Sequence, residues 1–214
     1  MNSNSIKLLD DRKLYLCCPY ISNMNSFLED VLRGGVDIVQ LRDKTLNDKE
    51  LIAAAFEMKA ICKRYGALFI VNDRPDIAVH VDADGVHVGQ DDIPPSVCRK
   101  ILGDNKIVGL STHSLEDYNS SINEPIDYIS AGPVVETPTK PNRPGTGIDY
   151  IRYIADTCKI PWYLTGDVNI KTVDGYIDAG ASRFVVVRYL TNSTDPKNDA
   201  SKLLEHIDGS RRLQ

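Results

Sequence analysis

The sequence predicts an α/β protein built as a single closed (β/α)8 TIM barrel. Eight short apolar, β-branched runs follow one another along the chain, and a helical pattern or a loop separates each run from the next. Such alternation of strands and helices is typical of a parallel sheet. A barrel of this kind usually takes about 200–400 residues, so 214 residues require short loops. An open doubly wound sheet is the alternative, but no GxGxxG motif follows the first run.

The order of the elements sets the limits of the barrel. The predicted strands are 14–19, 36–42, 67–73, 85–90, 106–112, 126–132, 161–165 and 183–190. Helices are predicted over 24–35 and 47–66, and further helices near Pro94, Ser114, Ile148, Asn169 and Lys197. The helix over 47–66 stops at Gly66, an ordinary C-terminal residue for a helix. We therefore expect one domain over 1–214, with its core between about 14 and 207 and frayed ends, which include the first dozen residues.

Composition excludes several classes of protein. Hydrophobic residues make up 42% of the chain and charged residues 26%, which is ordinary for a globular protein with a sizeable core. The formal net charge of −5 argues against a nucleic-acid-binding protein, which usually carries a basic stripe. Any site for an anionic small molecule must therefore be a local basic cluster on an acidic body.

Cysteine usage and hydropathy indicate a cytoplasmic protein. The five cysteines (17, 18, 62, 98 and 158) form no CxxC pair and no zinc-binding spacing, so reduced thiols are expected, with Cys17 and Cys18 in the core. The first residues lack the apolar segment of a signal peptide. No apolar run approaches the roughly 18–20 residues that cross a bilayer. We expect no membrane partner, and the oligomeric state stays open, a homo-oligomer included.

One long loop stands out between the sixth strand and the next helix. It reads AGPVVETPTKPNRPGTG over 131–147, and its prolines exclude regular structure. Loops of this length in a compact domain are usually functional or disordered. Thr137 and Thr139 offer hydroxyl donors and Lys140 offers a cation, which suits a phosphorylated ligand. The alternative is a surface loop stiffened by proline.

The second predicted strand ends in alternating polar residues. Gln40, Arg42 and Lys44 would share one face if the strand continues through them. An arginine fork beside a lysine point charge makes a good clamp for a diphosphate. The alternative is a solvated strand end.

Carboxylates follow the next two strands. Asp73 follows Asn72 at the end of the third strand, and Asp91 and Asp92 follow the fourth. Two carboxylates from neighbouring strand ends, beside cations that bind phosphate, fit a magnesium site. Spacing alone does not choose between Asp91 and Asp92, and one of the two could instead cap the helix near Pro94.

The remaining strand ends suggest a second anion site. Ser111 is either a donor to a phosphate oxygen or a helix cap, and His113 is either a base or a packed residue. Gly166 follows the seventh strand, and Arg188 lies within the predicted eighth strand. The loops after strands seven and eight often bind phosphate in these barrels. We therefore expect a magnesium-assisted anion site near strands two to five and a metal-free one near strands seven and eight.

Taken together, these motifs resemble those of the thiamine phosphate synthase family. The matching segments are QLRDK (40–44), VNDR (71–74), DGVHVGQDD (84–92), GLSTH (109–113), GPVVETPTK (132–140) and AGASRFVVVR (179–188). The resemblance extends from Leu14 to about Ile207. It implies the (β/α)8 fold and an enzyme that joins 4-amino-5-hydroxymethyl-2-methylpyrimidine diphosphate to a 4-methyl-5-hydroxyethylthiazole phosphate. The implied products are thiamine phosphate and diphosphate, and Mg²⁺ is required.

The resemblance also implies roles for the matching residues. The pyrimidine substrate would be bound through its ring by Gln40 and through its diphosphate by Arg42, Lys44, Asn72, Ser111 and Lys140. Of these, the residues that stabilise the departing diphosphate, and so count as catalytic, would be Arg42, Lys44, Ser111 and Lys140. Magnesium would be held by Asp73 and Asp92, with Asp91 left over. The thiazole phosphate would lie against Thr137, Thr139, Gly166, Val187 (through its backbone amide) and Arg188.

The implied mechanism is dissociative. The electron-rich pyrimidine stabilises a methylene cation, which the thiazole nitrogen captures, so that no side-chain nucleophile is needed. This agrees with the absence of a Ser-His-Asp or Cys-His pattern from the sequence.

One position departs from the family pattern. The family usually reads Gly-Gly-Ile or Gly-Gly-Val after the seventh strand, whereas this chain has Gly166-Asp167-Val168. A carboxylate about 4 Å from a phosphate repels it by about 1 kcal/mol or more. We expect Asp167 either to point outward as a cap for the helix near Asn169 or to pair with a cation. Otherwise it weakens the thiazole-phosphate site.

Two other functions are considered. A thiazole tautomerase-like relative would share the barrel and could use His113 as a base, but it would have no use for the cations and paired aspartates. A non-catalytic protein that senses the thiazole phosphate or the product would keep the anion sites without turnover.

Overall fold

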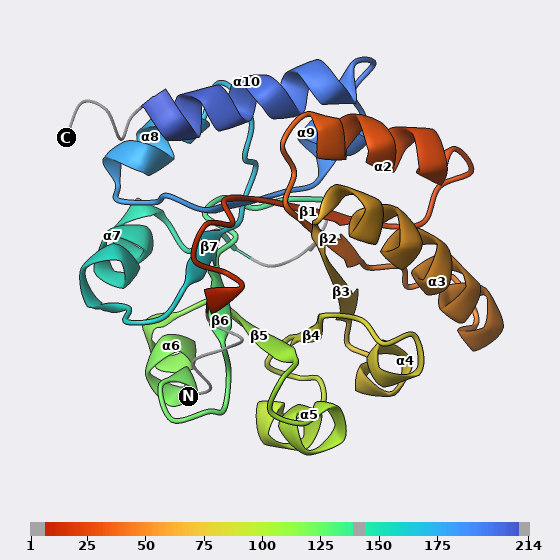
Figure 1. The fold of residues 1–214 in the computed structure, drawn as a ribbon. Helices are drawn as coiled ribbons and strands as arrows, with labels where there is room; N and C mark the ends of the chain where they lie inside the picture. Colours follow the sequence, from red (N-terminus) through yellow and green to blue (C-terminus); the bar gives the residue numbers. More distant parts are fainter. Residues whose placement is uncertain (1–6, 139–143, 210–214) are drawn as a thin grey trace.

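A closed ring of eight parallel strands forms the centre of the protein. The computed structural model describes residues 7–138 and 144–209. Each strand is hydrogen-bonded to the next in sequence order, and β8 returns to β1. Helices surround the ring on its outer side (Figure 1). The predicted (β/α)8 barrel is confirmed.

The element bounds agree with most of the predicted segments. The strands are β1 (Leu14–Cys18), β2 (Ile38–Leu41), β3 (Leu68–Asn72), β4 (Gly85–Val88), β5 (Ile107–Thr112), β6 (Tyr128–Ala131), β7 (Trp162–Leu164) and β8 (Phe184–Val186). The helices are α2 (Met24–Arg33), α3 (Asp48–Tyr65), α4 (Pro75–His80), α5 (Pro95–Leu102), α6 (Leu115–Ser121), α7 (Ile148–Thr157), α8 (Val173–Asp178), α9 (Arg188–Thr191) and α10 (Pro196–Gly209).

The predicted eighth strand is too long. It was expected to contain Arg188, but β8 ends at Val186 and Arg188 begins the short helix α9. Leu16 is the last residue of β1 that pairs with β8, opposite Val186. Beyond that point the backbone pairs locally, as in the bond from the Thr191 N–H to the Val187 carbonyl (3.0 Å). The apolar run alone carries no information about where the partner strand stops.

The eighth helix begins later than predicted. It was expected near Asn169, but α8 starts at Val173. The side chains of Asn169 and Thr172 instead stabilise a turn that precedes the helix. The Asn169 Oδ1 accepts from the Lys171 N–H (2.9 Å), and the Thr172 hydroxyl donates to the Asp167 carbonyl (2.8 Å). Such side-chain bonds compete with helical backbone bonds.

Alternation along the strands divides the apolar residues into two cores. Leu14, Leu16 and Cys18 of β1 face the surrounding helices. Tyr15, from the same strand, faces the barrel interior. The interior cluster consists of Leu9, Tyr15, Ile38, Leu68, Ile70, Ile107, Tyr128 and Tyr163. Its aliphatic members Ile38, Leu68 and Ile107 are the first residues of β2, β3 and β5, so hydrocarbon fills the amino-terminal end of the barrel.

The expectation that the whole N-terminal dozen residues are frayed is wrong. Leu9 is completely buried in the interior cluster. The side chain of Arg12 donates to the carbonyl of Asp37 (3.4 Å), which ties this segment to the start of β2. A single leucine in a polar stretch gives no periodic signal, and its burial depends on an opening that only the closed barrel creates. Residues 1–6 and 210–214 lie outside the described part of the chain.

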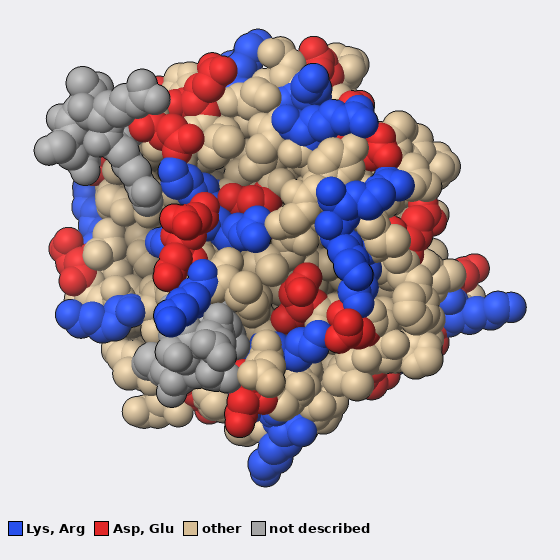
Figure 2. Space-filling model, viewed as in Figure 1, with Lys and Arg blue, Asp and Glu red and all other residues tan. Residues whose placement is uncertain are grey.

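Within residues 7–138 and 144–209, no helix combines the length and the hydropathy that crossing a membrane requires. On the face shown in Figure 2, acidic and basic side chains are interspersed rather than gathered into an extended basic stripe. That pattern accords with the negative net charge of the chain.

Gly109 leaves room for a ring in the barrel interior, and this generates a prediction about stability. A Cβ at position 109 would lie 2.1 Å from the Cζ atom of Tyr128. Gly109→Ala should therefore lower the free energy of unfolding by about 1–3 kcal/mol, because the buried ring must shift. Urea denaturation measures the effect. The matched control is Gly175→Ala in α8, where an added Cβ meets nothing within 4 Å, and it should be neutral or stabilising by about 0.4–1 kcal/mol. Equal stability of Gly109→Ala and the wild type would contradict this account of the interior.

Candidate active site

A cavity of about 380 Å³ opens at the carboxyl ends of the strands, where active sites of these barrels lie. Its lining includes most of the residues that the sequence singled out. These are Gln40, Arg42, Lys44, Asn72, Asp73, Asp92, Ser111, Thr137, Gly166, Val187 and Arg188. Thr139 and Lys140, which were also predicted, lie outside the described residues.

Gln40, Arg42 and Lys44 meet at the cavity although the strand does not run through all three. β2 ends at Leu41, so the period-two argument holds only as far as Gln40. The Arg42 N–H still donates to the Cys18 carbonyl (2.9 Å), which extends the pairing with β1 by one bond. Arg42 and Lys44 therefore reach the cavity wall from the loop that follows the strand.

Asp73 combines an unusual backbone with a perturbed carboxylate at the cavity wall. Its backbone has φ 60°, a left-handed conformation that is uncommon outside glycine. Its N–H donates to the His87 carbonyl (2.8 Å), and its carboxylate forms an ion pair with Lys44. Burial raises the pKa of Asp73 and the adjacent Asp92 carboxylate raises it further, while Lys44 opposes both effects. Strain and like-charge repulsion of this kind concentrate at functional sites.

The loop after β4 distinguishes the two aspartates. The Asp92 carboxylate accepts from the Gly89 N–H (2.8 Å), which turns it back toward the strand end. The expectation that one of the two caps the next helix is wrong. α5 begins at Pro95, its N-cap is Pro94, and no side chain caps it, since a proline at the first position has no N–H to satisfy. The Asp91 side chain is exposed at the cavity rim.

Asp73 and Asp92 are the two carboxylates that could hold a magnesium ion here, together with oxygens of a phosphorylated ligand. Among the residues the structure describes, no group of three or more His, Cys, Asp or Glu side chains could hold a metal on its own. Magnesium typically uses one or two carboxylates and completes its shell with phosphate oxygens and water. Burial is the larger cause of the raised pKa of Asp73, and the neighbouring Asp92 carboxylate adds to it. A bound divalent cation would offset that repulsion.

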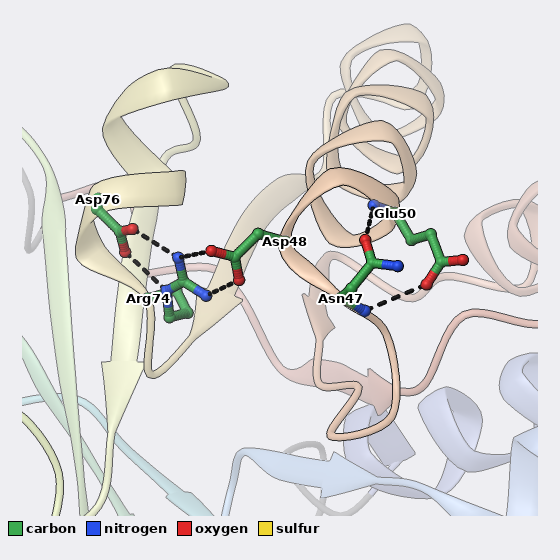
Figure 3. Close-up of polar contacts among 5 residues, drawn as sticks. All are labelled: Asn47, Asp48, Glu50, Arg74 and Asp76. Carbon is green, nitrogen blue, oxygen red and sulfur yellow. Dashed lines mark hydrogen bonds and ion pairs between the residues drawn. The ribbon is translucent and has the colours of Figure 1, made fainter.

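Hydrogen bonds connect the turn after β3, which follows Asp73, to the start of α3 (Figure 3). The Arg74 guanidinium donates to both carboxylate oxygens of Asp48 (2.6 and 3.3 Å) and to those of Asp76 (2.9 and 2.7 Å). It thereby joins the turn after Asp73 to the first turn of α3. In that turn Asn47 and Glu50 form the reciprocal bonds of a capping box.

The loop of Lys44 is held by a neighbouring carboxylate. Asp43 accepts from the backbone N–H groups of Tyr20 (3.1 Å), Thr45 (2.8 Å) and Leu46 (3.2 Å). Partial burial opposes the change, but the Thr45 hydroxyl (2.7 Å) and then these backbone bonds lower the pKa of Asp43. The side chains that face the ligand therefore stand on anchored backbone, which limits the reorganisation that binding requires.

The floor of the cavity is polar, and the sequence reasoning missed most of it. Tyr15, Cys17, His87 and Ser130 also line the cavity. Cys17 is buried within β1, as expected, and its thiol also lines the cavity floor, where it donates to the Gln40 Oε1 (3.2 Å). The signal that could have revealed these residues is a polar side chain at an inward position of a buried strand, because such a group needs a partner.

Ser111, in β5, and His113, directly after it, make different contacts at the cavity. Ser111 does not cap a helix, because α6 is capped by Ser114, whose hydroxyl accepts from the Asp117 N–H (3.0 Å). Instead, Ser111 lies at the cavity floor beside His87. His113 also lines the cavity, and its Nδ1 donates to the carbonyl of Gly132, so the proton of this contact resides on Nδ1.

The opposite wall comes from the loops after β7 and β8. A Cβ at Gly166 would lie 2.3 Å from the Val134 backbone nitrogen, so only glycine fits. Asp167 has φ 52°, and its carboxylate pairs with the Arg188 guanidinium at 3.4 Å. The predicted pairing with a cation is thus observed. No bond from the Asp167 side chain caps α8, whose N-cap is Thr172.

Charge balance at the cavity is unusual for an anion site. Arg42, Lys44 and Arg188 are the cations of the described lining, against the four carboxylates of Asp73, Asp91, Asp92 and Asp167. Within the described residues Arg42 forms no ion pair, and it is thus the cation most available to a ligand. A polyanionic ligand would meet net repulsion from this lining, which a divalent cation between ligand and carboxylates would reverse.

Comparison with known proteins identifies relatives along nearly the whole chain. The profile of the family described as thiamine monophosphate synthase matches residues 14–190. The thiamine-phosphate synthase of Acidothermus cellulolyticus is 42% identical over 204 residues, which cover 93% of this chain and 96% of that protein. That of Nostoc punctiforme is also 42% identical, over 94% of this chain but 58% of its own length, so this chain spans little more than half of that relative. A solved structure of thiamine phosphate pyrophosphorylase from Pyrococcus furiosus superposes with a TM-score of 0.85 at 27% identity, covering 96% of this chain and 97% of that one.

Proposed function

The chain belongs to the thiamine monophosphate synthase family, and from this premise we propose that it is a thiamine phosphate synthase. The substrates would be 4-amino-5-hydroxymethyl-2-methylpyrimidine diphosphate and 4-methyl-5-(2-phosphohydroxyethyl)thiazole. The bond between the methylene carbon and the diphosphate oxygen breaks, and its electron pair leaves with the diphosphate. The thiazole nitrogen then forms a bond to that carbon, which yields thiamine phosphate.

The observation that carries the proposal is that Gln40 lines the same cavity as the cations Arg42 and Lys44. Beyond its bonds to Tyr15 and Cys17, its amide retains one N–H and one oxygen lone pair. An aminopyrimidine edge offers the complementary acceptor and donor, as adenine does to glutamine. A diphosphate attached through the methylene group on the neighbouring ring carbon would extend toward Arg42 and Lys44, which line the same cavity.

Magnesium is part of the proposed chemistry. Asp73 and Asp92 would hold it together with diphosphate oxygens and water. When bound, it would supply charge neutralisation to the leaving diphosphate. Arg42, Lys44 and the Ser111 hydroxyl would stabilise the same developing charge from the protein side. Lys140, which the family resemblance adds to this set, lies outside the described residues.

The thiazole phosphate would occupy the wall formed by the loops after β7 and β8. Thr137 lies buried at this cavity and would donate its hydroxyl to the phosphate. The backbone amides near Gly166 and Val187 and the guanidinium of Arg188 would complete the site. Because the proposed reaction is dissociative, the protein needs no nucleophile, and alignment of the two substrates supplies much of the acceleration.

The setting of the reaction follows from the substrates and the thiols. Both substrates are small, charged molecules that need an aqueous compartment. None of the five cysteines, all within the described residues, forms a disulfide, a state that a reducing cytosol preserves. A cytosolic location is therefore part of the proposal.

The first test is a coupling assay on the purified chain with both precursors, with and without Mg²⁺. Thiamine phosphate and diphosphate should appear together, and a chelator should abolish both. Diphosphate without thiamine phosphate would mean that the pyrimidine half reacts while the thiazole site fails. Absence of both products would overturn the proposal and favour either proton transfer with His113 as base or a non-catalytic sensor.

Asp73 supplies the sharpest test of the metal assignment. Asp73→Ala should reduce turnover by about 100-fold or more, on the scale of losing one strong electrostatic group, and should weaken the response to Mg²⁺. Because Asp73 stands at a strand end and not in the apolar core, the fold should survive, which circular dichroism can verify. Asp91→Ala is the matched control and should stay within a few-fold of the wild type. Full magnesium-dependent activity of Asp73→Ala would refute the assignment.

Asp167 generates a prediction for the second substrate. Asp167→Gly should leave or improve the affinity for the thiazole phosphate, because it removes a carboxylate that competes for Arg188 and relieves a left-handed backbone. The KM for the thiazole phosphate measures the effect. Asp167→Asn separates charge from backbone strain, since it removes the charge alone. A large rise in KM for either variant would show that the carboxylate contributes positively.

A further inference from the structure

A continuous chain of hydrogen bonds crosses the cavity floor from Gln40 to Ser111. The Gln40 Nε2 donates to the Tyr15 hydroxyl (2.7 Å), which lies 2.9 Å from the Tyr128 hydroxyl. The Tyr128 hydroxyl lies 3.0 Å from the His87 Nδ1. The His87 Nε2 lies 2.9 Å from the Ser111 hydroxyl. The chain therefore joins five strands and connects the two residues proposed to contact opposite ends of the pyrimidine substrate.

The direction of the chain follows from counting donors. The Tyr15 hydroxyl accepts from Gln40, so its single hydrogen remains for Tyr128. The Tyr128 hydroxyl then accepts from Tyr15, and its own hydrogen goes to the His87 Nδ1. The reverse direction would leave the hydrogen of Tyr15, which is 1% exposed, without an acceptor in the chain. Buried donors are rarely left in that state.

Deep burial keeps both tyrosines in the protonated form that this counting requires. Burial raises the pKa of Tyr15 and of Tyr128 well above the ordinary value for tyrosine. Each hydroxyl therefore carries one hydrogen at neutral pH, and neither becomes a phenolate that could only accept.

The tautomer of His87 determines what Ser111 presents to the cavity. A neutral imidazole that accepts at Nδ1 carries its hydrogen on Nε2, and it donates that hydrogen to Ser111. The Ser130 hydroxyl donates to the same oxygen (3.3 Å). The Ser111 oxygen thus accepts twice, and its own hydrogen is left for a ligand in the cavity that it lines.

We propose that Tyr128 and His87 are positioning residues that hold the Ser111 hydroxyl as a hydrogen-bond donor to an anionic phosphoryl oxygen. The inference rests on the proposed function for the identity of the ligand as a diphosphate. It adds that the direction of the hydrogen bonds, which begins with the Gln40 amide, makes the Ser111 hydroxyl a donor to the ligand. The amide that reads the pyrimidine edge and the hydroxyl that contacts the leaving group are therefore parts of one directional network.

Packing makes it feasible to remove the Tyr128 hydroxyl alone. The Tyr128 ring is stacked on His87 (centroids 5.5 Å apart, planes at 23°) and lies edge-on to Tyr163 (5.4 Å, 79°). Those contacts remain in Tyr128→Phe, which deletes one hydroxyl and, with it, the two hydrogen bonds to Tyr15 and His87. Tyr163→Phe is the matched control, because its hydroxyl donates to the Arg12 carbonyl (3.3 Å) and not to the chain.

Two measurements on Tyr128→Phe test the proposal without relying on each other. In ¹⁵N-histidine-labelled protein, the wild-type His87 should show a protonated Nε2 and an unprotonated Nδ1, and Tyr128→Phe should shift the hydrogen toward Nδ1. His87→Gln assigns the resonances among the four histidines.

By calorimetry, the affinity for inorganic diphosphate with Mg²⁺ should fall about tenfold in Tyr128→Phe, the scale of one charge-assisted hydrogen bond. Tyr163→Phe should leave the His87 nitrogens unchanged and the affinity within about twofold.

A double-mutant cycle separates positioning from general damage. In the Ser111→Ala background, Tyr128→Phe should change diphosphate affinity by less than about twofold, because the group through which it acts is gone. An unchanged His87 tautomer, an unchanged affinity, or an equal loss in both backgrounds would overturn the proposal. If these binding and spectroscopic results are as expected but the coupling assay yields no thiamine phosphate, the proposed function fails and the assignment of the network stands.

Discussion

Closure of the parallel sheet is the constraint on which the rest of the molecule depends. Because β8 bonds to β1, the ring has no free edge, and every inward side chain must fit a space of fixed width. Closure also brings the carboxyl ends of all eight strands to one mouth. Residues as far apart in sequence as Gln40 and Arg188 line one cavity for this reason alone.

Along the barrel axis, the interior changes from hydrocarbon to aromatic rings to hydrogen-bonding groups. Leu9 closes one end, the rings of Tyr15, Tyr128 and Tyr163 pack against one another in the middle, and Gln40 and His87 form the floor of the cavity. The tyrosines suit the boundary because each has an apolar ring and a polar tip. Gly109 supplies the missing volume that lets one of these rings lie across the barrel.

The mouth of the barrel combines rigid support with local strain. Asp73 and Asp167 both have left-handed backbones, and both carry a carboxylate to the cavity wall, where each is paired with a cation. The clamp of Arg74 on Asp48 and Asp76 holds the turn after Asp73 in place (Figure 3). Such arrangements persist only where the surroundings determine the conformation. In the proposed function, a bound divalent cation would turn this acidic lining, which repels a polyanion, into a site that attracts one.

The sequence by itself determined the alternation of strands and helices, the barrel, and the residues at most strand ends. These features have short-range causes: a period of two or 3.6 residues, a glycine such as Gly66 at a helix end, or a capping residue such as Asn47. The site residues from Gln40 to Arg188 could be predicted because the fold sends every strand end to the same mouth. The sequence alone, however, does not indicate which side chains form the floor of the cavity beneath these residues.

Only the tertiary structure decided the burial of Leu9, the place of Cys17 at the cavity floor, the end of β8 before Arg188, and the pairing of Asp167 with that arginine. It alone revealed the bonds that link Gln40, Tyr15, Tyr128, His87 and Ser111. These contacts join residues up to 113 positions apart, and their partners are set by strand register and ring closure. Local sequence patterns carry no information about contacts at that separation, because side chains there meet only after the barrel has closed.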